Sequence, residues 1–414
     1  MHISSLNRLG QTIRPFDAVV AISLFLGLER SHHAWTLGLL TAWIGIRCCQ
    51  KVWEDHNQSG WREKNLHHII IGSLVFLQAR TIIRLDDHPG ASFYVLIAAG
   101  LSIGATYSAE KWMRLLRWIG CSALFLNIKL LWIGASGYPA GASANWLTAA
   151  NNEVFELGFG RINALSSVLA TLTILCFYGA RRDKNIAAKI IHSLGCISGY
   201  ALCLQTDSRI AAGAPLIAAV AAFGICIKDY AAGRRFKRIQ KRTIATIIGL
   251  ISVIGWSTAI QPELETGMAS EKLRLAFWQC WLQNSILVGN GKIIHGIGYN
   301  LKTMVNACDN QSADSGLVQI IGQHGFLGAL AIVLLLILMI RSFCNQRAEA
   351  LKTAEQSSAL HCSWPEAAMG CLLTVLLCNL TTPAYLGSFV GAALTGLSLS
   401  MSLTQESAPE PANT

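Results

Sequence analysis

The chain has 414 residues, of which 52% are hydrophobic and only 14% are charged, against about 25% charged residues in soluble domains. This composition excludes an ordinary large soluble enzyme. The formal net charge of +10 would suggest nucleic-acid binding in a soluble protein, but the basic residues here stand in short clusters between apolar runs, so we expect contact with anionic membrane lipids and no nucleic-acid partner.

The apolar runs are long enough to cross the hydrocarbon core of a bilayer as helices. The sequence therefore predicts an all-α integral membrane protein with about twelve transmembrane helices and a large outer loop that contains an interfacial helix. The predicted spans are residues 16–29, 34–49, 67–83, 93–109, 115–136, 162–180, 186–205, 210–228, 243–260, 318–340, 366–383 and 387–403. The resulting divisions are helices one to nine at 1–260, the outer segment at 261–317, helices ten to twelve at 318–403, and a polar cytoplasmic tail at 404–414.

Lysines and arginines gather in alternate loops of this arrangement. The clusters lie at residues 47–64, 111–117, 181–184, 234–242 and 341–352. Basic residues in short loops favour the cytoplasmic side. All five clusters thus predict cytoplasmic loops, two cytoplasmic termini and an outward-facing outer segment.

Five arginines fall on the opposite, outer face, where this bias disfavours them: Arg80, Arg84, Arg161, Arg209 and Arg274. An arginine at the edge of hydrocarbon is costly unless it is paired, reaches the interface or serves a ligand. Several converging guanidinium groups would form a site for phosphate oxygens. Plain ion pairs with nearby carboxylates are the alternative for Arg84, Arg161 and Arg209, and the sequence leaves that choice open.

The outer segment begins with a predicted amphipathic helix. Apolar side chains recur there at near-helical spacing, at Leu273, Phe277, Cys280, Trp281 and Ile286. Trp278 and Trp281 are expected to anchor this helix at the level of the lipid headgroups. Arg274 and Trp278 are four residues apart and therefore share one helical face.

Glycines and a capping motif follow this helix. Gly296 and Gly298 are expected to let the backbone approach a ligand or a neighbouring helix. Asp314 and Ser315 stand just before a helical run, where either side chain suits an N-cap. Further along, Gly322 and Gly325 indicate a break between a short helix and the tenth span.

Cysteines add one open question. Most of the thirteen lie inside predicted spans and behave as small apolar residues. Cys280 and Cys308 both lie in the outer segment, where a disulfide can form in an oxidising compartment, but spacing alone does not decide whether they pair. No spacing typical of a zinc site occurs.

Several short stretches, in their order and on their predicted membrane side, resemble the O-antigen polymerase and O-antigen ligase superfamily. They are "DSR" at 207–209, an arginine and a tryptophan at 274 and 278, "GIGYN" at 296–300 and "DSGLVQIIGQHGFLGAL" at 314–330. The likeness is best over residues 155–340 and includes "GFGRINALSSVLA" at 158–170, whereas residues 1–154 match in hydropathy only. It implies a multi-pass glycosyltransferase of the bacterial cytoplasmic membrane that acts on undecaprenyl-diphosphate-linked glycans at the outer face.

The resemblance also implies residue roles. Arg209 and Arg274 would be the two arginines of the family motifs, and Gly296 and Gly298 its glycine turn. Ligase members commonly carry a histidine at the position of Asp314, so the Asp314–Ser315 pair favours a polymerase, with a chain-length regulator as a natural partner.

The chemistry of such a donor fits these residues. A glycan on a lipid diphosphate is already activated, so we expect no metal, nucleotide or other cofactor. Arginines stabilise the departing diphosphate, while a carboxylate or an imidazole accepts the proton of the attacking hydroxyl. Asp314 is the first candidate for this base and His295 the second.

Two alternatives remain at this point. A ligase would transfer the glycan to another acceptor, and a transporter would move lipid-linked sugar without chemistry. A transporter commonly shows internal repeats, and we find no convincing repeat in the sequence.

Overall fold

The computed structural model describes residues 71–74, 97, 100–101, 109–137, 162–206, 208–233, 275–283, 308, 315, most of 317–337, 341, 344, 364–381 and 389–401. Within these residues the regular structure is helical, as the sequence predicts. The predicted spans at 16–29, 34–49 and 243–260 lie outside them.

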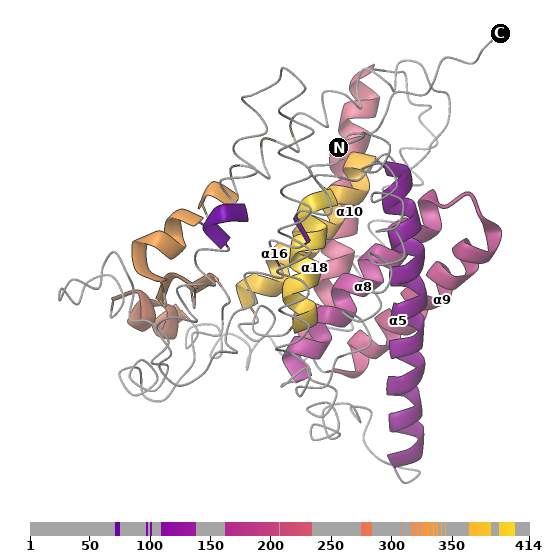
Figure 1. The fold of residues 1–414 in the computed structure, drawn as a ribbon, viewed down its shortest axis with the longest axis horizontal. Coiled ribbons are helices and arrows are strands. Elements are labelled where there is room, and N and C mark those ends of the chain that lie inside the picture. The colour runs from indigo at the N-terminus through magenta and orange to yellow at the C-terminus, as the bar shows by residue number, and fades with distance from the viewer. Residues whose placement is uncertain are drawn as a thin grey trace, which may run out of the picture.

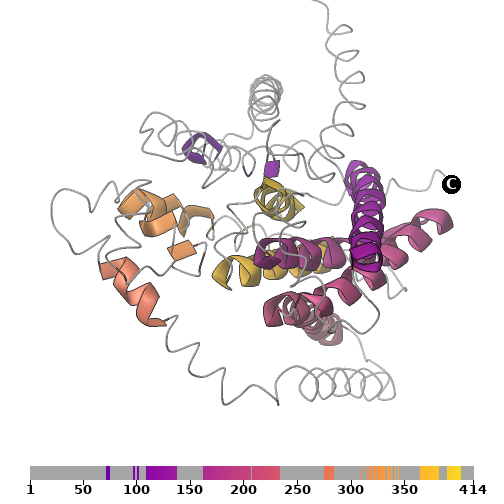
Figure 2. The ribbon, with the colours of Figure 1, turned by 90° about the horizontal axis from the view of Figure 1, so that it is seen from below.

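Six long helices gather into one bundle (Figures 1 and 2). They are α5 (Ala109–Gly137), α8 (Ile162–Arg182), α9 (Ile186–Gln205), α10 (Arg209–Gly233), α16 (Trp364–Thr381) and α18 (Phe389–Met401). Each coincides with a predicted span to within a few residues. Helix α8 contacts the other five and is mostly buried, so it forms the centre of the described bundle.

Three of these helices are long and apolar enough to cross a membrane, at Lys111–Trp132, Ala164–Arg182 and Ile186–Gln205. Shorter apolar helices occupy Ile210–Gly224, His324–Leu335, Glu366–Leu380 and Val390–Met401. The described residues thus support the membrane character of the chain. The count of about twelve spans stays a prediction.

Rows of large apolar side chains are exposed along α5 and α9. On α9 the row is Ile186, Ile190, Leu194, Ile197 and Leu204. Their spacing places them on one helical face. A continuous apolar stripe of this length is unfavourable in water but suits contact with lipid chains.

The opposite face of α9 includes small residues, among them Gly195 and Gly199, and packs closely. A Cβ at Gly199 would lie 2.6 Å from the hydroxyl oxygen of Thr173, and one at Gly195 would lie 3.0 Å from the sulfur of Cys176. Small residues four apart let helix backbones approach each other, which is a common packing mode in membranes. This face explains how α9 sits against α8 while its other side remains apolar.

Candidate functional site

Most of the predicted site residues lie outside the described residues. These are Arg80, Arg84, Arg161, Arg274, His295, Gly296, Gly298 and Asp314. The structure places the other two, Arg209 and Trp278, at the start of α10 and in the 275–283 helix. The convergence of the five arginines therefore stays a prediction.

Arg209 begins a helix directly after a tight reversal of the chain. Helix α9 ends at Gln205, where the Thr206 hydroxyl donates to the carbonyl of Cys203 at 2.7 Å. Helical hydrogen bonding resumes at once, because the N–H of Ala212 donates to the carbonyl of Ser208 at 3.1 Å. Arg209 thus stands in the first turn of α10, where the helix dipole disfavours a positive charge and favours an anion.

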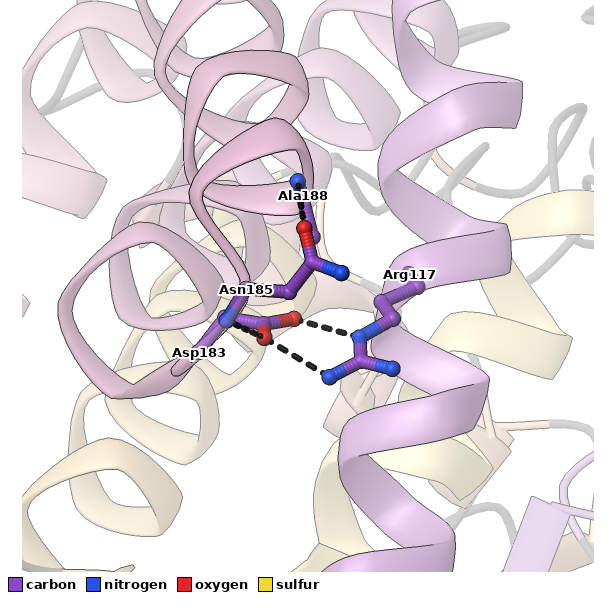
Figure 3. Close-up of polar contacts among 4 residues, drawn as sticks. All are labelled: Arg117, Asp183, Asn185 and Ala188. Atoms are coloured by element: carbon purple, nitrogen blue, oxygen red, sulfur yellow. Dashed lines mark hydrogen bonds and ion pairs between the residues drawn. The ribbon is translucent and has the colours of Figure 1, made fainter.

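The opposite end of the bundle holds a group of paired arginines, and Figure 3 shows the first pair. The Nε and Nη2 atoms of Arg117 on α5 donate to the two carboxylate oxygens of Asp183 at 2.7 and 2.8 Å. Asp183 stands between α8 and α9 and also accepts the backbone N–H of Asn185 at 2.9 Å, while the side chain of Asn185 caps α9 through Ala188. Burial alone would raise the pKa of the Asp183 carboxyl, but these hydrogen bonds and the charge of Arg117 outweigh it and lower the pKa.

Two further arginines at this end contact α16. Arg181 forms an ion pair with Glu366, whose side chain is almost fully buried. The guanidinium carbon of Arg182 lies 5.2 Å from the centre of the Trp364 ring, close enough for a cation–π contact. The indole N–H of Trp364 donates to the carbonyl of Met401 on α18 at 3.0 Å.

These contacts gather the beginnings of α5, α9 and α16 and the ends of α8 and α18 at one end of the bundle. The basic clusters in the loops predict that the same five helix termini lie on one side of the membrane, the cytoplasmic side. Helix α8 has 21 residues, so its two ends are about 30 Å apart. The start of α10 belongs to the other end, because α9 runs away from Asn185 before the chain turns at Thr206.

The 275–283 helix belongs to a small separate core. Cys280 forms a disulfide with Cys308, with the two Cα atoms 6.0 Å apart. Trp281 is 1% exposed and packs with Cys308 and Val318, and Trp278 packs against this core. The expectation of Trp281 as a headgroup anchor is therefore wrong, because its ring is inside the protein. The disulfide answers the pairing question that the sequence left open.

Ser315 caps the next helical run, as predicted. Its hydroxyl oxygen accepts the backbone N–H of Val318 at 3.4 Å, and its side chain is fully buried. Gly325 has a φ of 59°, a backbone conformation that favours glycine. The backbone thus departs from regular helix geometry at this residue, although helical residues continue on both sides of it.

Buried polar side chains between α5, α8 and α9 were not singled out from the sequence. The amide nitrogen of Asn127 donates to the carbonyl of Gly195 at 3.1 Å and to the hydroxyl of Ser198 at 2.8 Å. His192 is 1% exposed, and both its ring nitrogens lack a hydrogen-bond partner among the described residues. The spacing of Gly195, Ser198 and Gly199 on α9 is the signal that indicates a polar, closely packed face. Among the described residues, no group of three His, Cys, Asp or Glu side chains could hold a metal ion.

No protein-family model matches this chain, and no curated protein compared with it gives a significant match.

Proposed function

We propose that this protein is a membrane glycosyltransferase that polymerises oligosaccharide repeat units linked to undecaprenyl diphosphate, at the outer face of the bacterial cytoplasmic membrane. The observation that carries the proposal is the position of Arg209, the first residue of α10, at the bundle end away from the paired arginines. The helix dipole disfavours a positive charge at this position. The preference of basic residues for cytoplasmic loops disfavours it as well. A bound anion accounts for it.

The disulfide supports an outward-facing segment at 261–317. Stable disulfides form in oxidising compartments and are rare in the cytoplasm. The bond between Cys280 and Cys308 thus favours the same side of the membrane that the loop charges predict for this segment. Two independent physical signals thus support the outward orientation proposed for this segment.

In the proposed reaction, a hydroxyl of the acceptor glycan attacks the anomeric carbon of the donor sugar. The bond from that carbon to the diphosphate oxygen breaks, and the lipid diphosphate leaves with the bonding electrons. Asp314 accepts the hydroxyl proton, and His295 is the alternative base. The diphosphate already activates the donor, so the proposed reaction uses no metal or other cofactor.

The arginines bind and stabilise the leaving group. Arg209 and Arg274 contact the diphosphate through planar guanidinium groups, which match phosphate oxygens in a bidentate way. The three other arginines of the same predicted face, Arg80, Arg84 and Arg161, are proposed as further diphosphate ligands. Trp278, one helical turn from Arg274, and the turn at Gly296 and Gly298 would line the sugar side of the site.

Substitution of Arg209 by lysine tests this assignment, because lysine keeps the charge but loses the bidentate geometry. We expect Arg209→Lys to lower the polymer made per molecule of inserted protein by about 10²–10³-fold, the range for a contact made chiefly in the transition state. The measurement is the polymer ladder from cells, normalised to the protein in the membrane fraction.

The matched control is Arg114→Lys, which changes an exposed arginine near the other end of the bundle. Its polymer yield should equal that of the unmodified protein. Near-normal polymer from Arg209→Lys at normal protein levels would show that Arg209 only sets topology or pairs with a carboxylate, and would remove the main support for the proposed site.

A further inference from the structure

The small core around the 275–283 helix combines apolar side-chain contacts with one covalent bond. Within the described residues it consists of Trp281, Cys308 and Val318, with Trp278, Cys280 and Leu282 packed against them. A cluster of this size is a weak constraint on the position of a helix. The disulfide joins residues 28 apart in sequence and adds a covalent constraint to these contacts.

This core is also the link between the 275–283 helix and the bundle. Val318 belongs to the helical run that Ser315 caps. Ile320, two residues later, is buried in the main hydrophobic core of the bundle. The side chains of Ala331, Leu334 and Leu335 pack against that main core as well. Contacts thus run from the disulfide through Val318 and Ile320 to the transmembrane helices.

We propose that the Cys280–Cys308 bond positions the 275–283 helix against the bundle, and that an extracytoplasmic thiol–disulfide oxidoreductase forms it after the segment has crossed the membrane. The positioning part rests on the proposed function, because this helix carries Trp278 and immediately follows Arg274. The partner is identified by the chemistry that the bond requires.

The redox step balances with this partner. The thiols of Cys280 and Cys308 lose two protons and two electrons as the sulfur–sulfur bond forms. The disulfide of the oxidoreductase accepts them and becomes a dithiol, through a mixed disulfide with one of the two cysteines. The thiols of Cys176, Cys203, Cys371 and Cys378 are buried in the bundle and are not accessible to this exchange.

Peptide mass spectrometry of the full-length protein tests the bond. We expect a non-reduced digest to contain one cross-linked peptide pair joining Cys280 and Cys308, which separates on reduction. In cells that lack the oxidising protein of the outer compartment, the pair should be replaced by two free thiols. An absent cross-link in normal cells, or an unchanged cross-link without the oxidase, would overturn the proposal.

Cysteine substitution tests the positioning role. Loss of a cross-link over this separation raises the open population of the segment by on the order of a hundredfold, so Cys280→Ser should speed proteolysis at 261–317 and lower polymer yield. Cys308→Ser and the double variant should match it, because each breaks the same bond, whereas Cys344→Ser, at an exposed free cysteine, should behave as unmodified protein.

The two readouts separate the claims. Fast proteolysis with no polymer from even the unmodified protein would overturn the proposed function and leave the structural role of the bond intact. Proteolysis of Cys280→Ser at the unmodified rate would overturn the positioning role, whatever the polymer yield.

Discussion

Asp183 accepts three of the described hydrogen bonds at the bundle end that holds the paired arginines. It accepts both nitrogens of Arg117 and the N–H of Asn185. Its side chain is fully buried, whereas that of Arg117 is 42% exposed. Removal of the carboxylate charge should therefore leave a partly solvated guanidinium, which limits the penalty.

We expect Asp183→Asn to lower the free energy of unfolding by about 1–2 kcal/mol, a range set by hydrogen bonds to charged groups and reduced by solvent screening. Thermal unfolding of the purified protein in detergent measures it. Lys184→Gln removes the neighbouring exposed charge and serves as control. An equal loss from both variants would mean that the loss does not come from the contact between Asp183 and Arg117.

The same residue gives a pH dependence with a defined sign. The pKa of the Asp183 carboxyl is lowered in the folded protein. Its contribution to stability is therefore complete at pH values above the pKa of an unfolded aspartate, about 3.9. That contribution is lost as the pH falls through the pKa of the folded state. The difference in free energy of unfolding between the unmodified protein and Asp183→Asn should thus stay constant from neutral pH to about 5 and disappear only in stronger acid.

At the scale of elements, two backbones approach each other closely where α18 packs against the helical residues Ile97, Gly100 and Leu101. A Cβ at Gly396 would lie 2.4 Å from the carbonyl oxygen of Ile97 and 3.0 Å from the Cα of Gly100. Backbone atoms cannot move aside as a flexible side chain can. We expect Gly396→Ala to cost about 1–3 kcal/mol, the usual range for overpacking, measured by thermal unfolding.

Gly224 on α10 provides the comparison, because a Cβ there meets no atom within 4 Å. Gly224→Ala should be neutral or stabilising by up to about 1 kcal/mol, since alanine is the better helix former. Equal destabilisation by the two variants would contradict the close contact of Gly396 with Ile97 and Gly100.

The helices themselves could be predicted because their signals are local. Long apolar runs locate α8 and α9 almost to the residue. The predicted span begins at residue 115, because a hydropathy pattern omits charged residues such as Lys111 and Arg114. Helix α5 begins at Ala109, since lysine and arginine are good helix formers. The pattern also could not tell whether Trp281 faces lipid or protein, since both surroundings favour an aromatic ring.

The tertiary contacts could not be predicted in the same way. Arg117 and Asp183 are 66 residues apart, and Arg181 and Glu366 are 185 apart. Such pairs depend on which helices are neighbours, which no local pattern encodes. The same holds for Cys280 and Cys308, whose pairing requires a Cα–Cα distance that sequence spacing does not fix.

At the scale of the whole molecule, the described bundle has two unlike ends. One end holds Arg117, Arg181 and Arg182 in contact with carboxylates or an aromatic ring. The other holds the turn between α9 and α10, with Arg209 in the first turn of a helix. The proposed function assigns the first end to the cytoplasm and the second to the substrate.

Activity of the purified protein tests the central claim most directly. The protein is reconstituted in lipid vesicles with undecaprenyl-diphosphate-linked repeat units and without nucleotide or divalent metal, and the glycans are released and separated by size. We predict a ladder of products that differ by one repeat unit and a matching release of undecaprenyl diphosphate. Donor that stays unextended, with no lipid diphosphate released by folded and inserted protein, would contradict the account.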